Sequence, residues 1–307
     1  MKILVTGGAG YIGSVAVKRL IDAGHSVVVV DNLSKGCREL VNTKLYEIDL
    51  TNDSLEDVFR ENKFDGIIHF AAYKAVEESM SNAVKYSDNI VGSIKLLNLA
   101  VKYNVKRFVF SSTAAVYGET DSVLTEDSLT NPVNFYGFAK LEFEKILEWY
   151  SRVHGISYVS LRYFNVAGDV LGYIDPNAKN VFPIIMEVIN GKREEFTIFG
   201  DDYNTKDGSG VRDYIHVSDL VDAHILALDS SYVGVLNLGS GSGYSVKELV
   251  NVFKEVSGVD FKVKVVGRRA GDPGRVVASN AKAKKELGWE PKCTLRDMVE
   301  STMRAYK

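Results

Sequence analysis

A tyrosine and a lysine stand four positions apart in the run Tyr136-Gly137-Phe138-Ala139-Lys140, at the start of a helical pattern. This spacing places a phenol and an ammonium group one turn apart on the same helix face. A free phenol has a pKa of about 10 and is a poor base at neutral pH. We expect Lys140⁺ and a second cation in a partly dry site to lower the pKa of Tyr136. The phenolate could then remove a hydroxyl proton while a hydride leaves the same carbon.

A hydroxyl that could hold the reacting oxygen comes from the segment SSTAAVYG, Ser111 to Gly118. This segment closes a predicted strand at its carboxyl end, where open α/β sheets bind their ligands. We choose Thr113 as that hydroxyl, so the candidate catalytic residues are Tyr136, Lys140 and Thr113.

A glycine-rich turn near the start of the chain is the candidate cofactor site. In TGGAGYIG, Gly7, Gly10 and Gly13 fit G-x-x-G-x-x-G, between a predicted strand and a predicted helix. Such glycines let the backbone approach a pyrophosphate, which the helix N-terminus then attracts. Asp31 lies 18 positions after Gly13 and would accept hydrogen bonds from an adenosine ribose. Because a carboxylate there repels a 2′-phosphate, we expect NAD rather than NADP, although Lys35 and Arg38 lie nearby.

The elements that must position these groups alternate between strands and helices in the first half of the chain. Apolar, β-branched runs predict strands at 3–5, 27–30, 45–48, 66–70 and 107–111, and amphipathic patterns predict helices at 12–23, 54–61, 83–103 and 136–150. This alternation predicts an α/β fold, a Rossmann-like doubly wound parallel sheet.

From about residue 166 the pattern loosens into polar loops at 169–180 and 200–210, with a strand at 235–238 and helices at 245–257, 281–287 and 295–305. We therefore expect an NAD-binding Rossmann domain over 1–166. A smaller C-terminal mixed α/β substrate domain should follow over 167–307, with segments that interleave with the first.

Composition narrows the class of protein. The chain of 307 residues is 46% hydrophobic and 25% charged with a net charge of −3, so we expect no nucleic-acid or membrane partner. Cys37 and Cys293 should be free thiols, and we expect a cytoplasmic protein. The five histidines lack metal-ligand spacing, so we expect no metal site and only solvated or core roles for them; they are His25, His69, His154, His216 and His224.

Taken together, the motifs resemble the extended short-chain dehydrogenase/reductase family, and most closely its branch of UDP-hexose 4-epimerases. The resemblance runs through nearly the whole chain. It rests on TGGAGYIG (6–13), DNLS (31–34), HFAAYKAV (69–76), SSTAAVYG (111–118), YGFAK (136–140), LRYFNVAG (161–168), GVRDYIHVSDL (210–220) and RRAGDP (268–273). The chain departs from the family pattern at Glu77 and across 86–90.

The resemblance implies two sets of site residues. The cofactor, NAD, would meet Gly7, Gly10, Tyr11, Ile12, Gly13, Asp31, Asn32, Leu33, Ser34, Lys35, Gly36, Asp49, Leu50, Phe70, Ala71, Ala72, Lys74, Asn89, Tyr136, Lys140 and Phe164. The nucleotide sugar would meet Thr113, Tyr136, Asn165, Asn180, Val181, Thr197, Ile198, Phe199, Arg212, Arg269, Asp272 and Val276.

The resemblance also implies an activity: NAD-dependent 4-epimerisation of a UDP-hexose through a 4-keto sugar that turns about its diphosphate. Relatives that dehydrate sugars carry an acidic residue after the serine or threonine, whereas this chain has Ala114 and Ala115. The modest size of Val276 leads us to expect that N-acetylated UDP-sugars are also accepted. The resemblance further implies a homodimer formed by the helices at 83–103 and 136–150.

Two other readings remain open at this point. The chain could epimerise a different sugar nucleotide, such as a uronic acid derivative, or it could be an NAD-sensing regulatory protein without catalysis. The presence of Tyr136, Lys140 and Thr113 together argues against the sensor.

Overall fold

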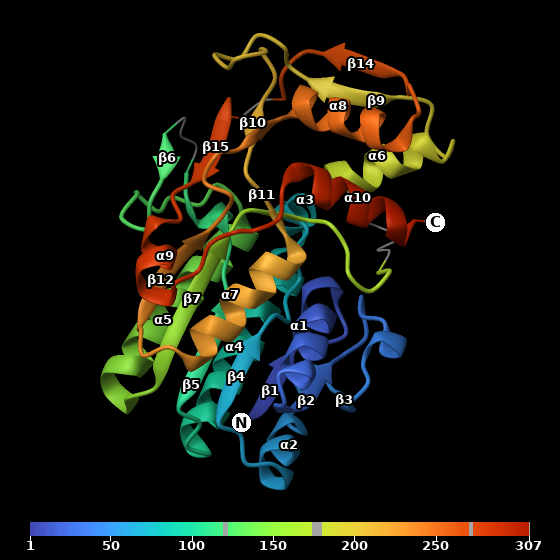
Figure 1. The fold of residues 1–307 in the computed structure, drawn as a ribbon. Coiled ribbons are helices and arrows are strands. Elements are labelled where there is room, and N and C mark those ends of the chain that lie inside the picture. Colours follow the sequence, from blue (N-terminus) through green and yellow to red (C-terminus); the bar gives the residue numbers. More distant parts are fainter. Residues whose placement is uncertain (119–121, 174–179, 270–272, 307) are drawn as a thin grey trace.

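A seven-stranded parallel sheet forms the centre of the computed structural model, which describes residues 1–118, 122–173, 180–269 and 273–306 (Figure 1). The strand order is β3-β2-β1-β4-β5-β7-β12, and every neighbouring pair is parallel. The strands are β1 (Lys2–Thr6), β2 (Ser26–Asp31), β3 (Lys44–Glu47), β4 (Gly66–His69), β5 (Arg107–Ser111), β7 (Ser157–Tyr163) and β12 (Gly234–Leu238).

Helices cover both faces of this sheet because successive strand residues point to opposite sides. On one face, Ile3 and Val5 pack against α1 (Tyr11–Asp22) and α7 (Val217–Asp229). On the other face, Leu4 packs against α2 (Leu55–Glu61), α4 (Ala83–Lys102) and α5 (Phe135–His154). The near-continuous apolar runs of the strands follow from this double coverage.

A second group of elements lies beyond the carboxyl ends of the strands (Figure 1). The helices α6 (Val181–Ile189), α8 (Val246–Ser257) and α10 (Leu295–Ala305) share a separate apolar cluster. Three small sheets accompany them: β9 (Phe196–Phe199) with β14 (Val263–Val266), β8 (Asn165–Ala167) with β11 (Tyr214–His216), and β13 (Tyr244–Ser245), β10 (Val211–Arg212), β15 (Arg275–Ala278) and β6 (Val123–Leu124) in that order. The remaining elements are α3 (Val76–Ser81), α9 (Ala281–Leu287) and the 3₁₀ turns η1 (Arg38–Leu40) and η2 (Ala114–Val116).

The predicted fold class is confirmed, and the predicted strands lie within two residues of their observed ends. The helix predicted at 136–150 is longer, because Asn134 caps its start and Gly155, with a φ of 69°, ends it. The strand β7 and the helices α6 and α7 were not predicted. Two elements that come late in the chain belong to the first group: β12 is a strand of the central sheet, and α7 covers one of its faces. The predicted division into two domains at residue 166 stays a prediction.

Within the described ranges, no helix is both long enough and apolar enough to cross a bilayer. The same residues contain no group of three histidine, cysteine or acidic side chains that could hold a metal ion.

Candidate active site

The turn between β1 and α1 is shaped for close backbone contact. Gly7 has a φ of 70°, and a Cβ there would lie 2.6 Å from the backbone nitrogen of Ala71. A Cβ on Gly13 would lie 2.0 Å from the carbonyl oxygen of Gly7. Both positions therefore require glycine, and the segment after β4 lies directly against the turn.

The first turn of α1 presents its N–H groups at this place. Gly10 is the N-cap and provides no side-chain cap, and the first turn has no acidic residue. Because the N-terminus of a helix carries partial positive charge and unpaired N–H groups, it can receive a phosphate. Ile12, in the same turn, packs partly into the core.

Asp31 ends β2 beside the turn, and its carboxylate orders two segments at once. Oδ2 accepts a hydrogen bond of 3.0 Å from the N–H of Ala9, and Oδ1 accepts one of 2.8 Å from Leu33. Burial raises the pKa of Asp31. A Cβ on Gly36 would lie 2.7 Å from the Cβ of Ala9, so the loop 31–36 packs against the glycine turn.

The amides around this loop hold neighbouring segments in place. Asn32 donates to Asp49 at 2.7 Å. Asn89, on α4, accepts from the N–H of Tyr73 at 2.8 Å and donates to its carbonyl at 2.9 Å. Since both polar atoms of Asn89 engage Tyr73, this side chain orders the segment that carries Phe70, Ala71, Ala72 and Lys74.

Tyr136 lies in the first turn of α5, against the end of β5. A Cβ on Gly137 would lie 2.2 Å from the carbonyl oxygen of Ala115, so the helix touches the backbone of η2. This contact brings the phenol of Tyr136 into hydrogen-bonding reach of Thr113. The Thr113 hydroxyl also accepts from the N–H of Ala115 at 3.1 Å.

Lys140 lies one turn further along, and is 4% exposed. Its Nζ donates to the carbonyl of Ser111 at 2.9 Å and lies 4.7 Å from the ring centre of Phe110. The same nitrogen is 6.0 Å from the ring centre of Tyr136. The three predicted catalytic residues are therefore together, at the carboxyl end of β5.

Burial shifts the pKa values of both members of this pair. Burial raises the pKa of Tyr136 to about 12, opposed by the hydrogen bond with Thr113. Burial also lowers the pKa of Lys140 to about 7, opposed by the charge of Glu144. The predicted lowering of the Tyr136 pKa rests on Lys140 together with a second cation, and it stays a prediction. The protein's own burial opposes it, because burial disfavours both charged forms. The lowering requires a further cation at the site.

Two buried histidines, His69 at the end of β4 and His224 on α7, have structural roles, as predicted. His69 lies 2.6 Å from the hydroxyl of Thr6 and 2.8 Å from that of Ser93, and burial places its pKa well below the usual value. His224 bonds Ser111, and burial lowers its pKa to about 4. Both imidazoles are neutral at physiological pH.

Among the residues predicted to meet the sugar nucleotide, those on β9 divide between two faces. Thr197 and Phe199 share one face, while Ile198 is 3% exposed and packs into the apolar cluster behind it. The guanidinium of Arg269 lies 3.8 Å from the ring centre of Phe199. Strand alternation turns the side chain of Ile198 away from the side that Arg269 occupies, so its predicted contact with the sugar nucleotide would be made by its backbone, and this contact stays a prediction.

The small sheet that carries Arg212 and Val276 has two faces with different surroundings. Arg212 pairs with Val276 across β10 and β15, and Val211 pairs with Arg275 on the opposite face. Val276 and Ala114 are both partly buried, and both pack against the apolar cluster that contains Phe164.

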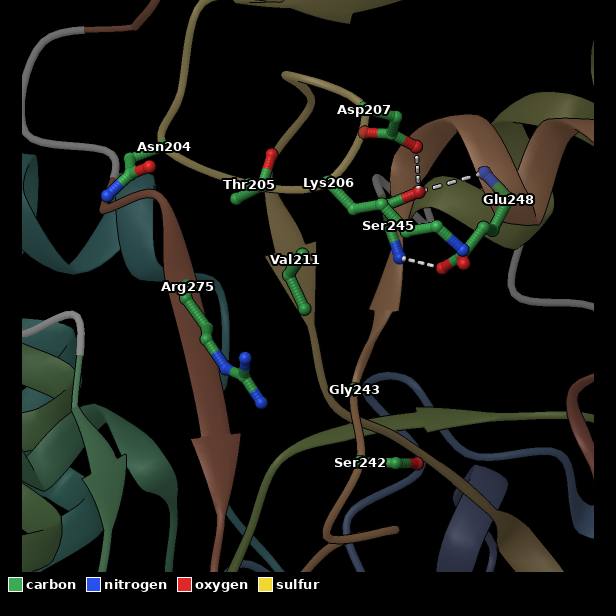
Figure 2. Close-up of a pocket in the computed structure, with 10 residues that line it drawn as sticks. All are labelled: Asn204, Thr205, Lys206, Asp207, Val211, Ser242, Gly243, Ser245, Glu248 and Arg275. Atoms are coloured by element: carbon green, nitrogen blue, oxygen red, sulfur yellow. Dashed lines mark hydrogen bonds between the residues drawn. The ribbon is translucent and has the colours of Figure 1, made fainter.

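A pocket of about 170 Å³ lies on the face of Val211 and Arg275 (Figure 2). It is therefore behind the sheet with respect to Arg212 and Val276. In Figure 2 its acidic groups already have partners, since Ser245 bonds both Asp207 and Glu248.

A second pocket lies between the central sheet with its helices and the second group of elements. It is lined by residues that include Tyr11, Lys74 and Asn180. The segment 168–173 contributes Gly168, Asp169 and Tyr173 to the lining. The hydroxyl of Tyr11 donates to the carbonyl of Gly168, and that of Tyr173 donates to the carbonyl of Lys35 at 2.8 Å. The rings of Tyr11 and Tyr173 stack with centres 5.9 Å apart.

The other predicted substrate residues have these places. Asn165, on β8, donates to the carbonyl of Asp213 at 3.1 Å, and Val181 begins α6 directly after Asn180. Asp272 lies outside the described residues.

The sequence analysis missed a buried acid beside the catalytic pair. Glu144, 4% exposed, follows Tyr136 and Lys140 at the same spacing of four along α5 and forms an ion pair with Arg162 on β7. The sequence contained a signal for this residue: Glu144 continues the spacing of Tyr136 and Lys140, and residues four apart share a helix face.

Comparisons with known proteins identify a family and several similar enzymes. Residues 3–239 match the NAD dependent epimerase/dehydratase family. The chain is 48% identical to a UDP-glucose 4-epimerase of Corynebacterium glutamicum, over 98% of this chain and 94% of that protein. A UDP-glucose 4-epimerase from Stenotrophomonas maltophila, solved with NAD and a formylated UDP-arabinopyranose, superimposes with a TM-score of 0.95 at 37% identity, over 100% and 98% of the two chains. The structure of a UDP-Glc/GlcNAc 4-epimerase from Campylobacter jejuni superimposes with a TM-score of 0.90 at 40% identity, over 99% of this chain and 98% of that chain.

Proposed function

Because this chain belongs to the NAD dependent epimerase/dehydratase family, we propose that it interconverts UDP-glucose and UDP-galactose by 4-epimerisation with NAD. One observation carries the proposal: the phenol of Tyr136 faces Thr113 beside the buried Lys140, at the carboxyl end of β5 and so on the same edge of the parallel sheet as the glycine turn. That is the arrangement needed to remove and return a hydroxyl proton beside a nicotinamide ring.

The glycine turn fits the dinucleotide. Gly7 and Gly13 leave no room for a Cβ, and the first turn of α1 has free N–H groups to receive a pyrophosphate. Asp31 supports NAD over NADP because its carboxylate repels a 2′-phosphate. When bound, NAD supplies the acceptor for the hydride and a positive charge that favours the phenolate of Tyr136.

The chain's own residues then move and hold the proton. Tyr136 takes the proton of the sugar 4-hydroxyl, and Thr113 holds the reacting oxygen. After the 4-keto sugar has turned, Tyr136 returns the proton to the oxygen. Lys140 stabilises the phenolate between these steps.

A UDP-sugar is the substrate class that the second group of elements supports. Arg212 and Arg269 can grip a diphosphate, because a guanidinium fork matches phosphate oxygens. The relatives in the comparisons are named for UDP-sugars, and one of them for both UDP-Glc and UDP-GlcNAc. The modest size of Val276 supports acceptance of N-acetylated UDP-sugars here as well.

The organisation of the enzyme is part of the proposal. The Rossmann domain spans 1–166, supplemented by α7 and β12, and the remainder of 167–307 binds the sugar nucleotide. Apolar side chains exposed on α4 and α5 support a homodimer, since the two helices pack side by side and exposed apolar patches mark protein contacts; they are Val84, Val91, Phe138, Trp149 and Val153. We propose a cytoplasmic location, supported by the free thiols Cys37 and Cys293.

The experiment is a coupled assay with UDP-glucose, UDP-galactose and their N-acetylated forms. We expect turnover of the first two, and a fall of at least about 10²-fold in kcat for Tyr136→Phe. Tyr150→Phe, at a partly buried tyrosine on the same helix whose hydroxyl bonds Asn98, is the matched control and should keep the wild-type rate. A folded, NAD-loaded protein without turnover would overturn the proposal and favour an NAD sensor. Absence of turnover with UDP-GlcNAc alone would overturn only the acceptance of N-acetylated sugars.

A further inference from the structure

Glu144 is a fully buried carboxylate that the proposed mechanism does not use. It lies one turn beyond Lys140 and two turns beyond Tyr136, on the same face of α5. Its side chain is closed off from solvent by the sheet, and the electrostatic influence that it exerts on Lys140 opposes the effect of burial.

Arg162, on the neighbouring strand β7, forms a bidentate ion pair with this carboxylate. Its Nη2 lies 2.6 Å from Oε2 of Glu144, and its Nε lies 3.0 Å from Oε1. The third nitrogen, Nη1, donates to the hydroxyl of Tyr117 at 3.0 Å, and that hydroxyl donates to Asn237 at 2.7 Å. The position of the carboxylate is therefore fixed by β7 and β12 and not by α5 alone.

The carboxylate in turn holds the strand end that carries Thr113. The hydroxyl of Ser112 donates to Oε1 of Glu144, and the ammonium of Lys140 donates to the carbonyl of Ser111. Two consecutive residues of the strand end are thus tied to α5 by side chains one turn apart. This sets the distance between the helix that bears Tyr136 and the hydroxyl of Thr113.

The other ionisable groups around Lys140 cannot supply a negative charge. His69, on β4, is held neutral by burial, and burial raises the pKa of Tyr163, on β7, so its phenol is also neutral. Tyr136, on α5, is neutral in the protein by itself. Arg162 lies behind Glu144 and carries the same sign as Lys140. Among the described residues, Glu144 is the carboxylate that acts on the ammonium of Lys140.

We propose that Glu144 is a positioning residue for epimerisation: its carboxylate, fixed by Arg162, balances the charge of Lys140 and holds Thr113 opposite Tyr136. The proposal rests on the proposed function for its effect on turnover. Its effect on the charge of Lys140 stands independently.

A purely structural ion pair would behave differently. Buried pairs can often be replaced by apolar residues of similar volume without loss of stability, whereas removal of one partner is costly. The test therefore uses Glu144→Gln, which keeps the shape, and the double variant Glu144→Leu/Arg162→Met, which removes both charges. Glu148→Gln is the matched control, because Glu148 forms an exposed pair with Arg152 one turn further along α5.

Two measurements decide the outcome. In turnover of UDP-galactose, we expect both Glu144 variants to lose about tenfold or more in kcat while KM changes little, since the carboxylate supports the proton transfer and not sugar binding. The alkaline limb of the kcat profile should move to lower pH, because Lys140 loses its proton earlier. Glu148→Gln should match the wild type in both.

The second measurement needs no turnover. The ionisation of Lys140 is followed by NMR of ¹³Cε-labelled lysine in the NAD-loaded protein, with Lys140→Met to assign the signal. The midpoint should fall in both Glu144 variants and stay unchanged in Glu148→Gln. If Glu144→Gln does not fold, the double variant decides. An unchanged midpoint in a folded Glu144 variant, or a double variant with wild-type kcat and pH profile, would overturn the proposal even if epimerisation is established.

Discussion

Lys140 carries a cost in stability that its chemistry explains. Burial lowers its pKa from 10.5 to about 7, so the folded protein disfavours the ammonium that the unfolded chain keeps. Below pH 7 both states bind the proton and the full penalty applies to the fold. Between pH 7 and 10.5 the unfolded chain binds more protons, so stability rises with pH over that window.

Lys140→Met should therefore be inactive and yet more stable. We expect the free energy of unfolding to rise by roughly 1–3 kcal/mol at pH 7, and the gain to shrink as the pH increases toward 10. Denaturant unfolding of the variant and the wild type at matched NAD occupancy measures this difference in the free energy of unfolding. Lys145→Met, at an exposed lysine paired with Glu142, should change stability by less than about 0.5 kcal/mol. A variant at position 140 that is less stable than wild type at pH 7 would contradict this account.

At this scale the residue types were predictable, but their ionisation was not. The spacing of Tyr136 and Lys140 and the strand-end position of Thr113 follow from local pattern. The direction of their pKa shifts depends on how completely other elements bury them, and α5, β4 and β5 are far apart in sequence. The partner of Glu144 could not be predicted either, because Arg162 comes from a strand that the pattern did not reveal.

Among the elements, the contact between α5 and η2 decides how the site is assembled. The helix approaches so closely that its second residue faces Thr113, and Gly137 is what permits the approach. Any side chain at that position would collide with the backbone of Ala115, which cannot move without moving Thr113.

Gly137→Ala should separate the phenol from the hydroxyl. We expect kcat to fall by about 10²-fold, since a displacement of about 1 Å can cost that much, while NAD remains bound. Gly155→Ala, at the other end of α5 in a left-handed conformation with open space around it, is the control. It should lower the free energy of unfolding by about 1 kcal/mol without changing kcat. Equal kcat values for the two variants would count against the close contact as the positioning device.

Element patterns predicted most of the central sheet and little of what lies above it. Buried strands can be predicted because they are continuous apolar runs, and helices such as α4 and α5 because they have long amphipathic repeats. In β9 the alternation of Thr197, Ile198 and Phe199 already indicated that the three side chains cannot share one face, since one of three consecutive strand residues must face away from the other two.

For the whole molecule, the exposed apolar face of α4 and α5 carries the dimer proposal. Trp149 and Val153 are four residues apart on α5 and are 62% and 66% exposed. A face of this kind is stabilised by a second copy of itself, because a two-fold interface pairs the same patch on both chains.

Replacing both with lysine, Trp149→Lys/Val153→Lys, should give a monomer in sedimentation equilibrium where the wild type is a dimer. Buried like charges facing each other across the two-fold axis disfavour association. Leu129→Lys, at a residue that is 83% exposed outside these helices, should leave the dimer intact. A monomeric wild type, or a double variant that still dimerises, would refute the proposed interface.

The position of β12 has a consequence for how the chain matures. This strand covers the outer edge of β7, yet Gly234–Leu238 is synthesised long after the glycine turn, β1 and Asp31. In a nascent chain the edge of β7 stays unpaired until Leu238 has been synthesised. An unpaired strand edge can form hydrogen bonds with other chains, which leads to aggregation. The glycine turn is thus synthesised at the start of translation, whereas the edge of its sheet at β7 is covered only after Leu238 has been added.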